Sequence, residues 1–302
     1  MVVDILILGA GWSSSFLIAL CKERNISYAA TTRDGRDGTI PFTFDPNSDD
    51  VQPFKALPSA RTVVITFPLE NKGTSRRLLE LYASSRAGGA ENKTSFRFIH
   101  LGTSSIWDGH RPDQHVPNQP TQHQWYDRRS TFKVTPRAEA EEELLSLSSQ
   151  YPSTVLNLAG LWGGSRSMRA VVGRLAPTKE ALKNRASLHM IHGIDVARSI
   201  LAVHQDFDKA QGERWLLTDG RVYDWWDLAS AWGSKYPTKG ESVTHYDPED
   251  RGPQAEWVRE LMDEANVRAL PRDVSALGRA LDSRDFWRTF ALSPLKARLE
   301  EN

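Results

Sequence analysis

Two glycines near the start of the chain, and the serines after them, are of the types and spacing that could bind a phosphate. Gly9 and Gly11 follow an apolar run at residues 2–8 and precede a helical pattern that contains Ser13 and Ser14. Gly9 permits a sharp turn, Gly11 lets backbone approach a ligand, and the first N–H groups of a helix attract a pyrophosphate. Ser14 stands where a third glycine is usual. We therefore predict dinucleotide binding; the alternative is an ordinary strand–helix turn.

The end of the second predicted strand, residues 26–33, bears on the choice of dinucleotide. In such folds an acidic residue here accepts a hydrogen bond from the 2′-hydroxyl of NAD, whereas an arginine pairs with the 2′-phosphate of NADP. Thr32 and Arg33 favour NADP, with NAD as the alternative because Asp34 is adjacent. Arg33 could instead be a solvated side chain. Asp45, at the end of a short third strand, either contacts the adenine amine or caps the turn that follows.

Apolar, β-branched runs alternate with helical patterns along the chain. The strands that we expect are residues 2–8, 26–33, 42–45, 61–68, 96–101, 154–159 and 214–219, and the later helices are 137–148, 166–183, 225–232, 254–266, 273–281 and 284–290. The alternation predicts an α/β fold, a doubly wound parallel sheet of about seven strands with a smaller, mostly helical C-terminal lobe. Ligands bind at the carboxyl ends of such strands, which places Thr66, Phe67, Pro68 and Gly102 at the site.

Composition excludes several classes of protein. The 302 residues include 38 basic and 38 acidic residues, and this balance favours neither nucleic-acid nor membrane binding. The single cysteine, Cys21, cannot form an intrachain disulfide, and the apolar N-terminal run is too short for a membrane span. We expect a cytoplasmic protein. The residues His110, His115 and His123, in a long loop at 108–131, match no zinc-binding spacing, so we expect no metal.

Several motifs together resemble the extended short-chain dehydrogenase/reductase superfamily, of the NAD-dependent epimerase/dehydratase type. The matching segments are Gly9-Ala10-Gly11-Trp12, Thr103-Ser104-Ser105-Ile106-Trp107-Asp108, Leu158-Ala159-Gly160-Leu161-Trp162-Gly163, Ile191-His192-Gly193-Ile194-Asp195 and Asp219-Gly220-Arg221. The resemblance implies a Rossmann domain for NADP at residues 1–160, to which 189–219 return, and a substrate lobe at 161–188 and 220–302. It implies that Trp12, Ser13, Ala159 and Leu161 lie beside the cofactor, and it suggests a homodimer.

The catalytic pair of this superfamily, Tyr-x-x-x-Lys, is absent in register. Because Glu139-Ala140-Glu141 resembles the Ala-Ala-Glu of the family, Lys133 falls at the tyrosine position and Arg137 at the lysine position. Arg137 could bind the ribose hydroxyls but cannot shuttle protons, because guanidinium stays charged. Lys133 would act as an acid only with a lowered pKa, and is otherwise an exposed lysine. Thr103 matches the serine or threonine that orients the substrate oxygen.

Tyr126 is the remaining candidate acid. It lies seven residues before Lys133 in the long loop, where it could swing into the site or pack on the surface. The chain is therefore expected to be an NADP-binding oxidoreductase that acts on a carbonyl or sugar-like small molecule. The alternative is a catalytically silent NADP-binding redox sensor or scaffold protein.

Overall fold

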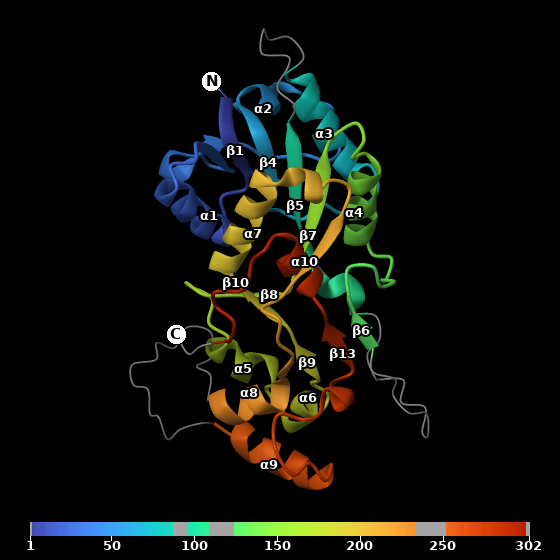
Figure 1. Ribbon diagram of the computed structural model, residues 1–302. Coiled ribbons are helices and arrows are strands. Elements are labelled where there is room, and N and C mark those ends of the chain that lie inside the picture. The colour runs from blue at the N-terminus through green and yellow to red at the C-terminus, as the bar shows by residue number, and fades with distance from the viewer. Residues whose placement is uncertain (1, 87–95, 109–123, 234–251, 300–302) are drawn as a thin grey trace.

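The computed structural model describes residues 2–86, 96–108, 124–233 and 252–299 (Figure 1). Its central element is a sheet of seven strands in the order β11-β7-β5-β4-β1-β2-β3. Every neighbouring pair in this sheet runs parallel. The sheet confirms the predicted α/β fold, because the chain first builds β1 to β3 on one side and then β4 to β11 on the other.

The elements have the following bounds. The strands are β1 Val2–Leu8, β2 Tyr28–Thr32, β3 Ile40–Pro41, β4 Ser59–Ile65, β5 Arg97–Thr103, β6 Gln124–Tyr126, β7 Ser153–Leu158, β8 Gly160–Trp162, β9 Ser187–Leu188, β10 Met190–His192, β11 Arg214–Leu217, β12 Tyr223–Asp224 and β13 Arg279–Leu281. The helices are α1 Trp12–Glu23, α2 Gln52–Lys55, α3 Thr74–Ser84, α4 Pro136–Ser146, α5 Arg169–Leu175, α6 Lys179–Lys183, α7 Gly193–Gln205, α8 Trp225–Trp232, α9 Gln254–Glu264 and α10 Arg284–Thr289.

Helices cover both faces of the sheet. On one face α1, α7 and α10 pack over alternate strand residues, and Cys21 lies buried among them as a small apolar residue (Figure 1). On the other face α3 and α4 contribute Leu78, Leu79 and Leu144 to a second core. Because both faces are covered, the central strands β1 and β4 are largely apolar, whereas β5 and β7 also bury polar side chains.

A further apolar cluster lies among α5, α6, α8 and α9, which occupy the lower part of Figure 1. Trp162, Trp225, Trp226 and Trp232 are buried in it. These aromatic side chains supply the large apolar area that short helices need in order to pack. The division of the chain into a cofactor domain and a substrate lobe remains a prediction.

Three local predictions were wrong. The third strand is Ile40–Pro41 and not 42–45, because β2 ends at Thr32, where the N–H of Phe42 makes the last hydrogen bond between the two segments. The expected helix at 166–183 is interrupted at Pro177, and the side chain of Thr178 caps α6.

The third error concerns residues 273–281, which form a 3₁₀ turn at Val274–Leu277 and then β13 in place of a helix. β13 pairs in parallel with β6, so the long loop expected at 108–131 also contains a strand. The histidines His110, His115 and His123 lie outside the described residues.

The buried carboxyl of Asp219 lies in the chain between β11 and β12, and its ionisation should make the stability of the protein depend on pH. Asp219 accepts hydrogen bonds from Tyr223 Oη at 2.6 Å and from the N–H of Arg221 at 3.0 Å. Burial raises the pKa of Asp219 to about 7, from the ordinary 3.8. The folded state therefore keeps a proton that the unfolded state releases between about pH 4 and 7, so the free energy of unfolding should fall as pH rises across that window.

We expect this loss of stability to be roughly 2–4 kcal/mol, at about 1.4 kcal/mol per pKa unit. Asp219→Asn should remove it. Urea unfolding at pH 5 and pH 7.5 measures the difference, and an unchanged difference in the variant would contradict the assignment.

Candidate functional site

A cavity of about 960 Å³ lies where the strand order reverses, between β1 and β4. Gly9, Gly11, Thr32, Arg33, Thr66, Phe67 and Pro68, all predicted from the sequence, line it. Gly9 has a φ of +98°, and a Cβ there would stand 2.7 Å from Thr66 Oγ1. A Cβ on Gly11 would meet nothing within 4 Å. Gly9 thus makes the turn, and Gly11 leaves its backbone open to the cavity.

The loop between β1 and α1 is held in place from both sides. Gly9 N–H donates to Thr31 Oγ1 at 3.0 Å, and Thr66 Oγ1 donates to the Gly9 carbonyl at 2.5 Å. The first turn of α1 has no side-chain cap. The amide dipoles of that turn are therefore available to an anion in the cavity.

The far end of this cavity is basic. Arg33 is exposed at the end of β2, and Arg36, which the sequence reasoning missed, also lines the cavity. Arg36 Nη1 lies 3.3 Å from Asp34 Oδ2, so the neighbouring acid holds one of the two guanidinium groups. Asp45 does not line the cavity. Its Oδ1 accepts the N–H of Asn47 at 2.9 Å, which is the capping alternative considered above.

Aromatic side chains form one wall. Phe44 and Phe67 are stacked with their ring centroids 6.2 Å apart, and Phe42 lies on the same cavity. Flat apolar rings of this kind suit a planar base.

A second cavity of about 190 Å³ adjoins the first, because Thr66 and Pro68 line both. It lies at the carboxyl ends of β4, β5 and β7, beside α4. The predicted residues that line it are Ser13, Gly102, Thr103, Arg137 and Leu161. Leu69, His100, Leu101, Glu141 and Leu158 line it too, and sequence reasoning named none of them as site residues.

Two of the candidate catalytic residues lie at this cavity. Thr103 Oγ1 donates to Ser105 Oγ at 3.0 Å and accepts the N–H of Ser105 at 3.2 Å, so it begins the 3₁₀ turn Ser104–Trp107. Arg137, at the start of α4, pairs with Glu70 Oε1 at 3.3 Å and keeps 43% of its side chain exposed.

The other two candidates lie elsewhere. Lys133 is exposed and lines neither cavity; its backbone N–H donates to the Ile106 carbonyl at 2.9 Å. Tyr126 is buried in β6, in a small cluster with Trp107 and Leu281, and burial raises the pKa of its phenol. The tyrosine is therefore a packing residue in this structure.

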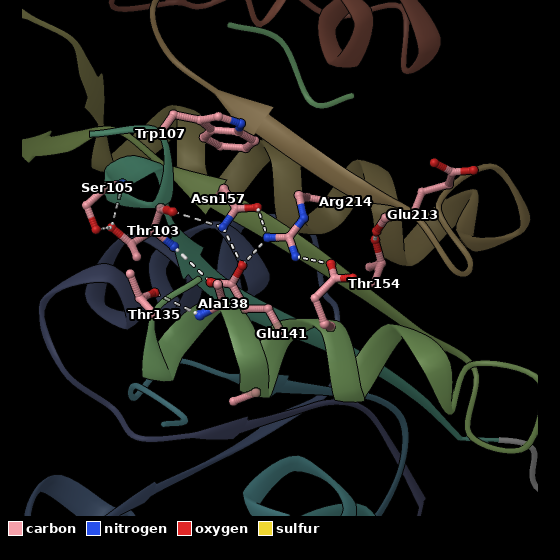
Figure 2. A network of polar contacts seen from close by, with 12 residues as sticks. Thr103, Ser105, Trp107, Thr135, Ala138, Glu141, Thr154, Asn157, Glu213 and Arg214 are labelled. Atoms are coloured by element: carbon pink, nitrogen blue, oxygen red, sulfur yellow. Dashed lines mark hydrogen bonds and ion pairs between the residues drawn. The ribbon is translucent and has the colours of Figure 1, made fainter. Parts of the chain in front are cut away.

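Beneath the second cavity lies a buried polar network (Figure 2). Asn157 Nδ2 donates to Glu141 Oε2 at 2.8 Å and to the Thr103 carbonyl at 3.0 Å. Arg214 forms an ion pair with Glu141 and donates to Asn157 Oδ1 at 3.1 Å. Burial raises the pKa of Glu141, although the guanidinium of Arg214 acts in the opposite direction. The network fixes the backbone at Thr103, because the Thr103 N–H also donates to Glu141 Oε1 at 3.3 Å.

Gly102 is required by this network. A Cβ there would stand 2.4 Å from Glu141 Oε1 and 2.6 Å from Asn157 Nδ2. The sequence contained a signal for this network, because Asn157 and Arg214 belong to the otherwise apolar strands predicted at 154–159 and 214–219. Buried polar groups of this kind need partners.

Trp12 and Ala159 occupy places next to the site. Trp12 Nε1 donates to the Gly163 carbonyl at 3.1 Å, and the guanidinium of Arg166 lies 4.5 Å from the Trp12 ring centroid. Trp12 therefore ties the glycine loop to the turn after β8. Ala159 is buried, and its N–H donates to the Leu217 carbonyl at 3.0 Å. Neither residue lines the two cavities.

Within the described ranges, no three His, Cys, Asp or Glu side chains are grouped as metal ligands. No helix in those ranges is both long and apolar enough to cross a bilayer.

No family model matches the sequence, and no curated protein does. Solved structures with a similar fold include one from Methylobacillus flagellatus named for an NAD-dependent epimerase/dehydratase, at 14% identity and a TM-score of 0.60 over 98% of this chain and 94% of that chain. MoeE5 in complex with UDP-glucose and NAD is 13% identical, with a TM-score of 0.58 over 96% and 93%. Yeast methylglyoxal/isovaleraldehyde reductase Gre2, complexed with NADPH, is 11% identical, with a TM-score of 0.58 over 100% and 96%. At these identities the likeness shows the fold alone: the chain shares the doubly wound α/β fold of these structures.

Proposed function

We propose that this protein binds NADP along the two adjoining cavities and acts as an oxidoreductase on a carbonyl or sugar-like small molecule. The observation that carries the proposal is that the two cavities lie side by side, with Thr66 and Pro68 in the walls of both, at the point where the strand order reverses. Their residues suit each part of a dinucleotide in turn. MoeE5 with NAD and Gre2 with NADPH, which share the fold, support the same class of ligand.

The adenosine half belongs in the larger cavity. The base lies against Phe44 and Phe67, the 2′-phosphate between Arg33 and Arg36, and the pyrophosphate at the first turn of α1. Phosphate is bound well by guanidinium groups and by helix N-termini. The open space beside Gly11 fits a backbone that a diphosphate approaches closely.

The nicotinamide half belongs in the smaller cavity. When bound, it supplies the hydride donor or acceptor. Arg137 is placed to bind ribose hydroxyls, and the Thr103 hydroxyl to orient the oxygen of a substrate. Leu158 and Leu161 line the same cavity and exclude water from its apolar side.

A second candidate is a catalytically silent NADP-binding sensor or scaffold. The observation in its favour is the placement of Lys133 on the surface and of Tyr126 inside a separate cluster. Among the described residues, neither a tyrosine nor a lysine lines the smaller cavity. The usual proton donor of the superfamily thus has no counterpart there.

One experiment separates the two candidates. NADPH binding is followed by nicotinamide fluorescence, and aldehydes, ketones and nucleotide sugars are then screened for oxidation of NADPH. Turnover supports the oxidoreductase. Tight binding without turnover, unchanged in Lys133→Ala and Tyr126→Phe, supports the sensor, and failure to bind either NADPH or NADH refutes both.

The cofactor preference rests on Arg33 and Arg36. Arg33→Ala should weaken NADPH binding about 10- to 100-fold, which corresponds to a lost charge-assisted contact, and should leave NADH binding within about twofold. Arg36→Ala should act in the same direction with a smaller effect, because Asp34 already engages that guanidinium.

Arg61→Ala is the matched control for fluorescence titration with both cofactors, since Arg61 is an exposed arginine that lines neither cavity. Equal losses of NADPH and NADH affinity in Arg33→Ala would contradict the NADP assignment.

A further inference from the structure

The imidazole of His100 is a buried polar group that the fold itself does not use. His100 stands in the middle of β5, between Ile65 of β4 and Val155 of β7, and is 2% exposed. Neither Nδ1 nor Nε2 makes a hydrogen bond of good geometry, and the Phe67 backbone is near enough to act on the pKa of the ring. A buried donor and acceptor left unsatisfied cost stability, so such groups are uncommon unless something else binds them.

The position of the His100 ring allows it to contact a ligand in the smaller cavity. His100 lines the smaller cavity together with Thr66, Arg137 and Glu141. Gly102, two residues along the same strand, is on the same face of the sheet and has no side chain. Glu141 and Asn157 occupy the place that a Gly102 side chain would take, and His100, Gly102 and Thr103 all line the smaller cavity.

The ring is neutral near pH 7. Burial lowers the pKa of His100 to about 4. The Phe67 backbone opposes burial with the second-largest effect on this pKa, and the positive charges of Arg137 and Arg214 add smaller effects in the same direction as burial. A neutral imidazole offers one donor and one acceptor. A hydroxyl group matches both, whereas a phosphate or carboxylate offers no donor to the bare ring nitrogen.

We propose that His100 is a ligand-binding residue that hydrogen-bonds a ribose hydroxyl on the nicotinamide half of the dinucleotide. The inference rests on the proposed function and deepens it, since it assigns a residue of the smaller cavity to one half of the ligand. It also assigns the two polar groups different tasks: the Arg137 guanidinium only donates, while His100 both donates and accepts.

The test compares two probes, NADPH and 2′,5′-ADP, by isothermal titration calorimetry. The second probe has the adenosine half and its 2′-phosphate but no nicotinamide riboside. His100→Leu should weaken NADPH about 10-fold and leave 2′,5′-ADP within twofold. His100→Gln, which keeps a donor and an acceptor, should recover part of the NADPH affinity.

The thermal midpoint separates ligand binding from a structural role. Because His100→Leu removes an unsatisfied buried group, its melting temperature without ligand should equal or exceed that of the wild type. A lower melting temperature with equal losses for both probes would show a structural role and overturn the proposal. Unchanged NADPH affinity in His100→Leu would also overturn it.

An NMR measurement on the wild-type protein tests the proposal even if the His100 variants do not fold. The imidazole ¹⁵N chemical shifts of His100 should move when NADPH is added and stay in place when 2′,5′-ADP is added. If both probes bind and the shifts never move, the proposal for His100 fails while the proposed function stands. If the wild type binds neither probe, both fail.

Discussion

Arg214→Met should lower the free energy of unfolding by about 3–5 kcal/mol, the typical cost of leaving a buried charge without its partner. The Arg214 side chain is 6% exposed and pairs with Glu141, which is 0% exposed. Arg214 also donates to Glu142 Oε1 at 2.7 Å and lies over the ring of Phe132. Methionine fills much of the same volume but supplies no charge. Urea unfolding at pH 7 measures the loss.

Arg61→Met is the control for charge removal, because Arg61 is 70% exposed and its nearest acid, Asp4, is 3.6 Å away. We expect a change within about 1 kcal/mol there. The double variant Arg214→Met with Glu141→Leu should recover part of the stability, because it removes the carboxylate that the single variant leaves alone. A loss below 1 kcal/mol in Arg214→Met would show that the network contributes little.

Gly9→Ala should weaken NADPH binding at least about 100-fold and lower the melting temperature. At a φ of +98° a side chain is strained, and the new Cβ would stand 2.7 Å from Thr66 Oγ1. Strain of this kind costs about 1–3 kcal/mol, and the displaced loop would no longer direct the first turn of α1 toward the cavity. Fluorescence titration and thermal unfolding measure the two effects.

Two other glycines separate strain from contact with the ligand. Gly38 has a φ of +74°, lies outside both cavities, and has open space where a Cβ would stand. Gly38→Ala should therefore lower stability and leave NADPH binding unchanged. Gly11 has open space where a Cβ would stand, and its φ is not positive, so an alanine there is not strained. Gly11→Ala should therefore leave the melting temperature unchanged, but its methyl group should block the diphosphate and weaken NADPH binding. If Gly11→Ala binds NADPH like the wild type, the diphosphate does not lie against this loop.

The sequence by itself determined the doubly wound sheet and the glycine loop. Strands that are buried on both faces are mostly apolar, so their positions show in a short window of sequence. The turn at Gly9 and the cavity residues Thr32, Arg33 and Thr66 follow from the same local reasoning, because the carboxyl ends of parallel strands meet at one edge of the sheet.

Only the tertiary structure decided which polar groups meet. Glu141, Asn157 and Arg214 come from α4, β7 and β11, and their contact depends on how those elements pack (Figure 2). The pairing of β6 with β13 joins segments more than 150 residues apart, and each has three residues, too few to show a period of two. His100 has the burial of a core residue, and only the packing of α4 against β5 puts its ring beside a cavity. Local sequence patterns indicate which residues are buried and where the chain turns. A functional site depends on the distances between residues of different elements, and a local pattern does not contain those distances.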